Sequence, residues 1–393
     1  MSLKRSVADA TVRGKRVLVR VDFNVPLTAA GAVADDRRIV EALPTLQHLR
    51  AHGARTILMS HLGRPDGQRD MRFTLRPVVH RLSGLLGAPV PLAEDCVGLA
   101  PLQAVARLQN GDFLMLENLR FHSGEEANDP GFAGQLAQLG DLFVEEAFGT
   151  VHRAHASTVG VAHRLPAYAG FLVEKEIREL TPLVTGAEKP YVALLGGAKV
   201  ADKLPLLASF LGRADAILIG GALAFPFLAR QGAHLGATVV EPGLEEAVDE
   251  FLQLAREKGT QVVLPVDLLC EAPGSKDAVP AGIDAVPVEA IARDIGPRTR
   301  DRFYAVLQGS KTVFWNGPLG RAEDPRFAAG TREVLAGLAT LSGYHVCAGG
   351  DSARIAQDLG VDHAFQYIST GGGAALEFVQ GAELPGLAVL PNA

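Results

Sequence analysis

Residues 194–207 read LLGGAKVADKLPLL, and the same type of segment recurs along the chain. An apolar run ends in Gly196–Gly197, and a plausible helix carrying Lys199 and Lys203 follows at once. Strands that pass through glycines into helices are typical of α/β proteins, in which ligands bind beyond the carboxyl ends of the strands. The residue order differs from the P-loop G-x-x-x-x-G-K-[ST], so a different phosphate-binding arrangement is indicated.

Similar apolar runs alternate with helical patterns throughout the sequence. Near-continuous apolar strands between helices favour parallel sheets that are covered on both faces. We therefore expect an α/β protein with two doubly wound, Rossmann-like parallel-sheet domains that face a central cleft. The expected strands are RVLVRVDF (16–23), RTILMS (55–60), DFLMLEN (112–118) and LFVEEAF (142–148), then YVALLGG, AILIGGA, QVVLPVD, TVFWNGP, HVCAGGD and QYIST in the second half.

The length of 393 residues is too great for one ordinary core, so two domains are expected. Prolines punctuate both ends of the segment from Pro166 to Pro190, and its charged middle follows a helical pattern. We expect a first domain over residues 1–170, a connecting helix over 171–188 and a second domain over 189–375. The apolar tail, ELPGLAVLPNA, is expected to dock against the protein.

Composition argues against nucleic-acid-binding, disulfide-rich and membrane-spanning classes of protein. A net charge of −6 and a pI near 6.0 argue against a general nucleic-acid binder. The three cysteines (Cys96, Cys270 and Cys347) are far apart, which favours a reducing compartment and provides no zinc or disulfide framework in the sequence pattern. The start lacks a signal-peptide core, and the longest apolar run is shorter than the roughly 20 residues of a spanning helix. We expect a cytoplasmic protein.

Three glycine-rich strand ends in the second half indicate a polyphosphate site. Lys199 and Lys203 are spaced i, i+4 near a helix start, where free N–H groups and the helix dipole would add positive potential. Two lysines alone would favour a solvated pair on a surface helix, but the preceding Gly196–Gly197 pair permits close backbone approach and changes this balance. The other two turns are Gly349, Gly350, Asp351 and Ser352, and Gly371, Gly372 and Gly373.

Asp351 and Ser352 have two interpretations, because both residue types are good helix N-caps. An aspartate beside a phosphate-binding turn can also face Mg²⁺. The GSKT segment at 309–312 resembles part of a P-loop but precedes a strand, so we discount it.

Basic side chains follow strand ends in the first half. Arginine forks bind carboxylate and phosphate bidentately, so several of them at one sheet edge indicate a pocket for a small multivalent anion. Each arginine alone would be a surface residue in an ion pair, and the histidines at 152 and 155 could be structural. Asp22 and Asn24 would read hydroxyl groups or orient an arginine. The basic candidates are Arg38, His61, Arg64, Arg120, His152, Arg153 and His155.

A polyphosphate site in one half and a small-anion pocket in the other indicate phosphoryl transfer between their ligands, and two alternatives compete with this interpretation. A nicotinamide-dependent dehydrogenase would share the α/β class, but the chain lacks G-x-G-x-x-G. A non-catalytic nucleotide-binding α/β protein would keep the glycine turns without needing the arginine cluster.

Eight segments, in this order, resemble the signatures of the phosphoglycerate kinase family: RVDFNVPL, SHLGRP, LENLRFHSGEE, FGTVHRAHAS, GGAKVADK, WNGP, GGDS and STGGGA. The resemblance runs nearly from end to end. It implies reversible, ATP-dependent phosphorylation of the carboxylate of 3-phosphoglycerate to 1,3-bisphosphoglycerate in glycolysis. It also implies Mg²⁺ bound with ATP or ADP, a hinge-bending monomer, no nucleic-acid or membrane partner, and a C-terminal segment from about residue 376 to 393 that packs on the first domain.

The resemblance also implies residue roles. The substrate-binding set comprises Asp22, Asn24, Arg38, His61, Leu62, Gly63, Arg64, Arg120 and Arg153. Nucleotide contacts would come from Lys199, Lys203, Ala292, Glu323, Gly349, Gly350, Asp351, Ser352, Gly371 and Gly372. Arg38 and Lys199 would be catalytic, and Asp351 would face the metal.

Six residues at four places depart from the usual family pattern. Arg321–Ala322 replaces an apolar or aromatic pair, and Glu145–Glu146 replaces an Asn–Asp pair. Ala348 and Ala292 stand where glycine is frequent. None of these changes removes a charged catalytic group.

Overall fold

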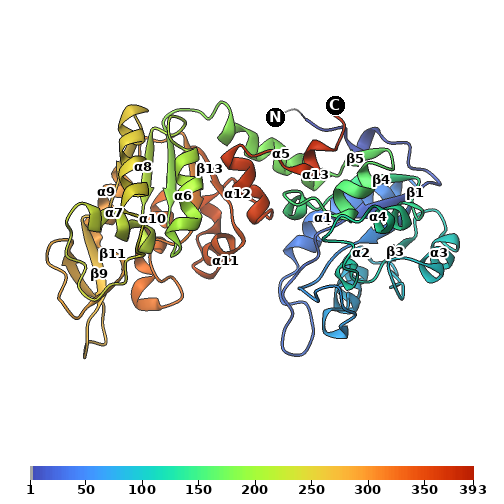
Figure 1. The fold of residues 1–393 in the computed structure, drawn as a ribbon, viewed down its shortest axis with the longest axis horizontal. Coiled ribbons are helices and arrows are strands. Elements are labelled where there is room, and N and C mark those ends of the chain that lie inside the picture. Colours follow the sequence, from blue (N-terminus) through green and yellow to red (C-terminus); the bar gives the residue numbers. More distant parts are fainter. Residues whose placement is uncertain (1–2) are drawn as a thin grey trace. The chain divides into compact units, whose positions relative to one another are not determined.

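The computed structural model describes residues 3–393, which divide into two compact units (Figure 1). The first unit extends to Glu179 and also takes in Glu383–Ala393, and the second unit spans Leu180–Ala382. The division falls within helix α5 (Phe171–Val184). Each unit is an α/β structure with its own parallel sheet, as the sequence predicted.

The first unit is built on a five-stranded sheet in the order β3-β2-β1-β4-β5, and every neighbouring pair is parallel. The strands are mostly buried, which explains their near-continuous apolar sequences. The strands are β1 (Arg16–Arg20), β2 (Arg55–Met59), β3 (Phe113–Met115), β4 (Leu142–Glu145) and β5 (Ala167–Ala169). The helices are α1 (Arg37–Ala51), α2 (Arg76–Leu86), α3 (Leu99–Ala106), α4 (Pro130–Ala137) and the short α13 (Pro385–Ala388).

The C-terminal segment is tied into the first unit by backbone hydrogen bonds. Arg5 N donates to Pro391 O at 2.9 Å, and Gly386 N donates to Val151 O at 2.8 Å. Helix α12 (Gly373–Gln380), by contrast, belongs to the second unit.

The second unit contains a six-stranded parallel sheet in the order β14-β13-β12-β6-β7-β8. Trp315 lies fully buried in its core and stacks on Phe365. The strands are β6 (Tyr191–Leu195), β7 (Ala216–Ile219), β8 (Gln261–Val263), β12 (Thr312–Asn316), β13 (Tyr344–Cys347) and β14 (Tyr367–Ile368). The remaining helices are α6 (Val200–Ser209), α7 (Phe225–Arg230), α8 (Glu245–Glu257), α9 (Pro297–Leu307), α10 (Ala329–Leu338) and α11 (Gly350–Asp358).

A three-stranded antiparallel sheet, which the sequence did not predict, accompanies this parallel sheet. It has the order β10-β9-β11, formed by β9 (Asp267–Glu271), β10 (Val279–Gly282) and β11 (Ile291–Ile295). Its strands contain buried Asp267 and Asp294, which interrupt the apolar pattern. Asp267 accepts hydrogen bonds from Arg298 N and Thr299 N in the first turn of α9, so the residue acts as a helix cap.

Candidate functional site

In the first unit, the candidate residues follow the carboxyl ends of adjacent strands. Asp22 and Asn24 follow β1, and residues 61–64 follow β2. Arg120 lies in a 3-10 turn, η3 (Leu119–Phe121), after β3, and Arg153 comes after β4. Because β1 to β4 are parallel neighbours, these loops emerge at one edge of the sheet.

Arg38 occupies the first turn of α1 and is held by the segment after β1. Its Nη1 donates to Asp22 Oδ2 at 2.8 Å and to Asn24 O at 3.2 Å. Both contacts use the same nitrogen, and within residues 3–393 neither Nη2 nor Nε of Arg38 donates to the protein. The guanidinium side chain is 31% exposed, so these two donors are available to a ligand.

A second set of contacts joins three strand ends through Gly63. Gly63 N donates to Asn24 Oδ1 at 2.9 Å, and Gly63 O accepts from Arg120 Nη1 at 2.9 Å. Gly63 has a φ of +63°, and a Cβ there would lie 2.3 Å from the ring of Phe73. Leu62 is fixed by Asn118, whose side-chain amide donates to Leu62 O at 2.7 Å. The structure therefore brings Asn24, Gly63 and Arg120 into one network.

His61 is buried and electrically neutral at physiological pH. Burial lowers its pKa well below the usual value, and the nearby charges of Arg20, Arg120 and Arg38 lower it further. Arg20 Nη2 lies 3.1 Å from His61 Nδ1. Because arginine can only donate, Nδ1 accepts this bond and the ring proton of the neutral imidazole lies on Nε2.

Arg20 is a central residue that the sequence analysis missed. Its side chain is 1% exposed, and it donates to Ser157 Oγ at 2.8 Å and to Val21 O at 2.5 Å. The buried Glu125 lies 3.9 Å away and provides opposite charge. The buried Arg20 therefore fixes the tautomer of His61 through its hydrogen bond to Nδ1. The sequence did not predict this role, because an arginine at the end of a strand is ordinarily a side chain exposed to solvent.

Arg64 and Arg153 are exposed and are not tied into this network. Arg64 makes no hydrogen bond or ion pair with the described residues, whereas Arg153 Nε donates to His152 Nε2 at 3.2 Å. The charge of Arg153 nevertheless helps to lower the pKa of Arg120, after the larger effect of burial. His155 is buried beside Glu125, and burial together with Arg20 lowers its pKa to about 3.

The Glu145–Glu146 pair, a departure from the family pattern, is completely buried. Glu145 Oε1 accepts from Ala147 N at 2.9 Å, while Oε2 has no hydrogen-bond partner in the described chain. Glu146 accepts from Leu172 N in the first turn of α5. Burial raises the pKa of Glu145 to about 8, against the opposing charge of Arg20, and burial raises the pKa of Glu146 well above its usual value.

These shifts predict that Glu145→Gln alters the pH dependence of stability. A raised folded-state pKa makes a stabilising contribution that is present below the unfolded value of 4.5 and is lost as pH rises through about 8. Between these limits, the free energy of unfolding of the parent chain should fall relative to Glu145→Gln, because glutamine does not ionise. Urea unfolding at a series of pH values measures the difference. The exposed-site control Glu250→Gln should run parallel to the parent, and parallel curves for Glu145→Gln would contradict the assignment.

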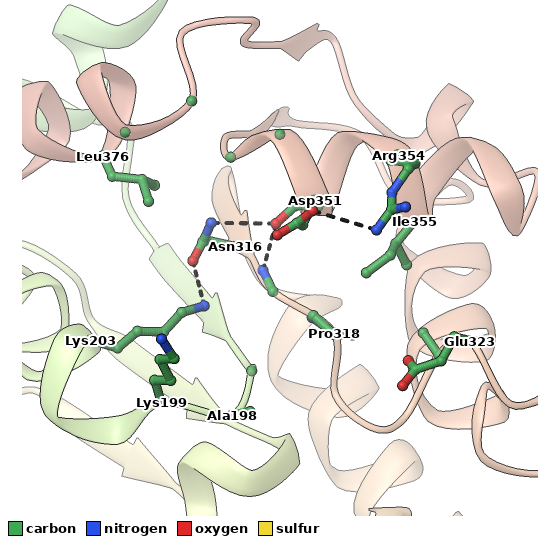
Figure 2. A pocket seen from close by; sticks show the side chains of 18 of the residues that line it. Ala198, Lys199, Lys203, Asn316, Pro318, Glu323, Asp351, Arg354, Ile355 and Leu376 are labelled. Carbon is green, nitrogen blue, oxygen red and sulfur yellow. Dashed lines mark hydrogen bonds and ion pairs between the residues drawn. The ribbon is translucent and has the colours of Figure 1, made fainter. Parts of the chain in front are cut away.

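In the second unit, most of the candidate residues line a cavity of about 710 Å³ (Figure 2). The lining includes the first residues of α6, α11 and α12, each of which follows a strand of the parallel sheet. The predicted residues found there are Lys199, Lys203, Glu323, Gly349, Gly350, Asp351, Ser352 and Gly372.

Lys203 is fixed at the wall of this cavity. Its Nζ donates to Gly196 O at 2.5 Å and to Asn316 Oδ1 at 2.7 Å. Burial lowers its pKa to about 8, and the charge of Asp351 acts in the opposite direction. Gly197 has a φ of +119°, and a Cβ there would lie 2.9 Å from Lys203 Nζ. The glycine is therefore required by both its conformation and the proximity of the lysine.

Asn316 connects Lys203 to the start of α11. Its Nδ2 donates to Ala348 O at 2.7 Å and lies 3.3 Å from Ser352 Oγ. Ser352 Oγ also accepts from Gly317 N at 2.8 Å. The contact to residue 348 uses the backbone carbonyl, so alanine at this position preserves it. Asn316 and Gly317 belong to the WNGP motif, but nothing in the local sequence predicted that they line the site.

The start of α6 differs from the sequence prediction. Lys199 is the N-cap of α6 and is not a helical residue, so Lys199 and Lys203 do not form a pair on one helical face. The first two amides of the helix are also not free: Val200 N and Ala201 N donate to Glu241 at 2.9 and 3.4 Å. A distant carboxylate therefore caps the helix, and sequence spacing could not reveal it.

Two predicted nucleotide contacts lie outside the cavity lining. Ala292 is buried in β11, and its amide donates to Thr238 Oγ1 at 2.8 Å. Gly371 is buried in the turn before α12, where its amide donates to Ser369 Oγ. Glu323 does line the cavity, but Arg321, one of the departures, lies 3.2 Å from its carboxylate.

A cavity lined by lysines, acidic side chains and glycine-led helix starts, in a chain with two parallel α/β sheets, is typical of a nucleotide-binding α/β phosphotransferase. Comparisons with known proteins narrow this class. The family model described as phosphoglycerate kinase matches residues 7–382. The chain belongs to the phosphoglycerate kinase family.

Individual relatives agree with the family model. The chain is 48% identical over 389 residues to the phosphoglycerate kinase of Moorella thermoacetica, covering 98% of this chain and 99% of the relative. The corresponding values for Chlorobium luteolum are 44% over 393 residues, with 98% and 99% coverage. The phosphoglycerate kinase structure from Coxiella burnetii is 36% identical with a TM-score of 0.89, and that from Pyrococcus horikoshii is 32% identical with 0.85, each with 98% coverage of both chains.

The family establishes the activity as a kinase reaction of glycolysis, with transfer of a phosphoryl group between ATP and the carboxylate of 3-phosphoglycerate. The alternative of a non-catalytic nucleotide-binding protein is not favoured. Over residues 3–393, no helix combines the length and apolar character that a membrane crossing requires.

Proposed function

We propose that the cluster around Arg38 in the first unit binds 3-phosphoglycerate and that the cavity in the second unit binds the Mg²⁺–nucleotide. The observation that carries this proposal is the single cavity lined by Lys199, Lys203 and Asp351 together with the glycine turns. Lysine charge and backbone amides suit a polyphosphate, whereas the arginine forks of the first unit suit a small acid that carries both carboxylate and phosphate.

Asp351 is the residue proposed to face Mg²⁺. Its side chain is 92% exposed at the cavity, and its contact with Arg354 Nη2 is long, at 3.5 Å. A carboxylate held this loosely fits a hard cation that prefers oxygen ligands and retains several waters. When bound, the metal would neutralise phosphate charge and orient the polyphosphate.

The proposed mechanism needs no general base. A carboxylate has a reference pKa near 4, so the acceptor is already ionised at neutral pH. One of its oxygens attacks the γ-phosphorus of ATP, and the bond from phosphorus to the β,γ-bridging oxygen breaks to release ADP. The barrier is repulsion between two anions, which Arg38 and Lys199 are positioned in their respective units to reduce.

Transfer also requires the two ligands to meet with water excluded, so we propose that domain closure about a hinge accompanies the reaction. We further propose that the chain acts as a cytoplasmic monomer without a nucleic-acid or membrane partner. Its net charge of −6 supports the absence of a nucleic-acid partner.

Equilibrium binding to two variants tests the assignment of ligands to units. Lys203→Ala should weaken ADP binding by at least about tenfold, the cost of a lost charged hydrogen bond, while leaving 3-phosphoglycerate binding unchanged. Arg64→Ala should do the reverse, because Arg64 is exposed in the first unit and has no protein partner among the described residues. Isothermal titration calorimetry measures both affinities. Loss of both ligands in one variant, or of the wrong ligand, would contradict the proposal.

A further inference from the structure

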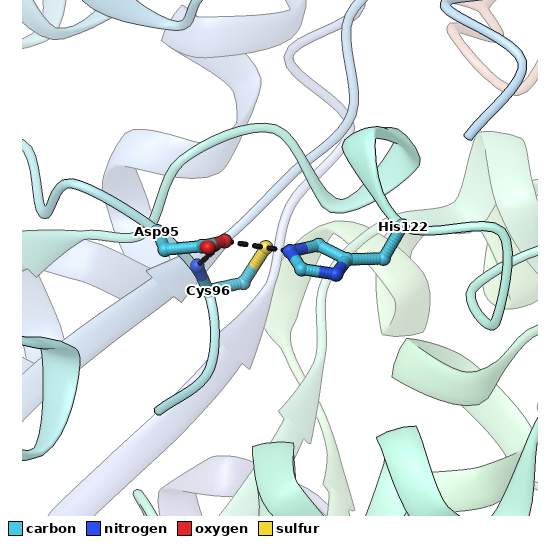
Figure 3. A group of neighbouring side chains, drawn as sticks. All are labelled: Asp95, Cys96 and His122. Carbon is cyan, nitrogen blue, oxygen red and sulfur yellow. Dashed lines mark hydrogen bonds and ion pairs between the residues drawn. The ribbon is translucent and has the colours of Figure 1, made fainter. Parts of the chain in front are cut away.

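A group of potential metal ligands in the first unit belongs to neither of the two candidate ligand sites. Asp95 and Cys96 lie in the loop between α2 and α3, and His122 directly follows η3 (Figure 3). One ligand atom from each residue lies within 4.8 Å of the other two. His122 lies 26 positions after Cys96, which matches no short zinc-binding spacing, so the fold and not the sequence pattern brings them together.

The group is held in place by its surroundings. His122 Nε2 lies 2.6 Å from Asp95 Oδ1, which also accepts from Cys96 N at 2.7 Å. The His122 ring stacks on Phe132 with ring centroids 5.0 Å apart, which limits its rotation. The Cys96 thiol makes a weak contact of 3.7 Å with Asn118 O. The nitrogen, oxygen and sulfur atoms are therefore fixed near one another by contacts from separate segments.

The three donor types select the class of metal. A thiolate with an imidazole and a carboxylate suits zinc and its substitutes, whereas Mg²⁺ prefers oxygen ligands alone. Zinc bonds of about 2.0–2.3 Å in a tetrahedron place ligand atoms about 3.3–3.8 Å apart. The separations here, from 2.6 Å up to at most 4.8 Å, lie on both sides of that spacing. Side-chain shifts of about 1 Å would complete the geometry.

Access and charge are also compatible with a cation. The Cys96 side chain is buried, while the side chains of Asp95 and His122 are 33% and 30% exposed. A metal can therefore enter from the side of Asp95 and His122 and keep water as a fourth ligand. Arg69 Nη1 lies 4.0 Å from Asp95 Oδ2. A bound metal would therefore compete with the Arg69 guanidinium for the Asp95 carboxylate.

We propose that Asp95, Cys96 and His122 form a binding site for a zinc-type divalent cation, separate from the Mg²⁺ that accompanies the nucleotide. The site adjoins the substrate cluster through the chain: Asn118 is the N-cap of η3, which carries Arg120. A bound cation would therefore restrain the segment that holds one of the proposed substrate arginines.

Titration of the metal-free, full-length chain with Co²⁺ tests the proposal, because a cobalt–thiolate bond produces a near-ultraviolet charge-transfer band. We expect this band to saturate with a single equivalent of Co²⁺ and to disappear when Zn²⁺ is added. Cys96→Ala should abolish it, and His122→Gln should weaken affinity by at least about tenfold. Cys270→Ala, which removes a buried thiol outside the group, should leave the titration unchanged.

The circular dichroism spectrum establishes that each variant is folded. Arg69→Ala should have the opposite effect on Co²⁺ affinity from the Cys96 and His122 variants. Removal of the competing guanidinium should tighten Co²⁺ binding. Absence of a thiolate band in the parent chain, or the same band in Cys96→Ala, would overturn the site. Unchanged affinity in Arg69→Ala would overturn the inclusion of Asp95.

Discussion

Arg38→Ala is expected to lower the turnover number by about 10²–10³-fold or more while the chain remains folded. This is the typical cost of removing one donor that stabilises developing charge in the transition state. Arg38 fits that role because Asp22 Oδ2 and Asn24 O both accept from Nη1, which leaves Nη2 and Nε without a partner among the described residues. Steady-state kinetics with ATP and 3-phosphoglycerate measure the loss, and circular dichroism checks the fold.

Arg37→Ala is the matched control for this prediction. Arg37 is the adjacent residue of the same helix turn and has a similar exposure of 35%, but it is paired with Asp35 through its guanidinium. Its removal should leave kinetics near normal. Near-normal turnover in Arg38→Ala, or an equal loss in Arg37→Ala, would show that the catalytic arginine has been wrongly assigned.

Lys199→Ala is expected to produce a loss of similar size, about 10²–10³-fold in turnover. Lys199 is exposed at the cavity, and among the described residues its Nζ has no hydrogen-bond or ion-pair partner. An ammonium group that has no protein partner in the ground state can bind the phosphoryl group during its transfer. The loss should therefore fall on kcat more than on KM for ATP, as expected for an interaction made in the transition state.

Lys189→Ala controls for the removal of a lysine from the same unit. Lys189 Nζ donates to Arg213 O at 2.6 Å and to Asp215 Oδ1 at 3.1 Å, away from the cavity lining. This variant should retain normal kinetics. If Lys199→Ala instead raises KM for ATP with kcat unchanged, Lys199 contributes only to binding of the nucleotide.

The parallel strands could be predicted because buried, near-continuous apolar runs carry a strong signal. The structure confirms the predicted starts of β1, β2 and β4 at residues 16, 55 and 142, and β3 starts one residue after the prediction, at 113. Each of these strands ends before its predicted limit. The predicted strands ran on into the loops that carry Asp22 and His61. These loops remain apolar between their functional residues, so hydrophobicity alone did not mark the strand ends.

The parts of the site that could not be predicted depend on contacts between distant segments. Arg20 looks like an ordinary strand residue until Ser157 and Glu125 are placed beside it. Glu241 reaches the amides of α6 from a loop about 40 residues away in the sequence, and no local pattern encodes that cap. Glycine turns and charged motifs predicted the content of the cavity, while tertiary contacts determined which groups remain free for a ligand.

The most direct measurement is the rate of 1,3-bisphosphoglycerate formation from ATP and 3-phosphoglycerate, followed with Mg²⁺ present and after chelation. We predict rapid formation with the metal, near-complete loss when it is chelated, and full recovery when Mg²⁺ is restored. Equal rates with and without Mg²⁺, or no phosphorylation of 3-phosphoglycerate under either condition, would contradict the account.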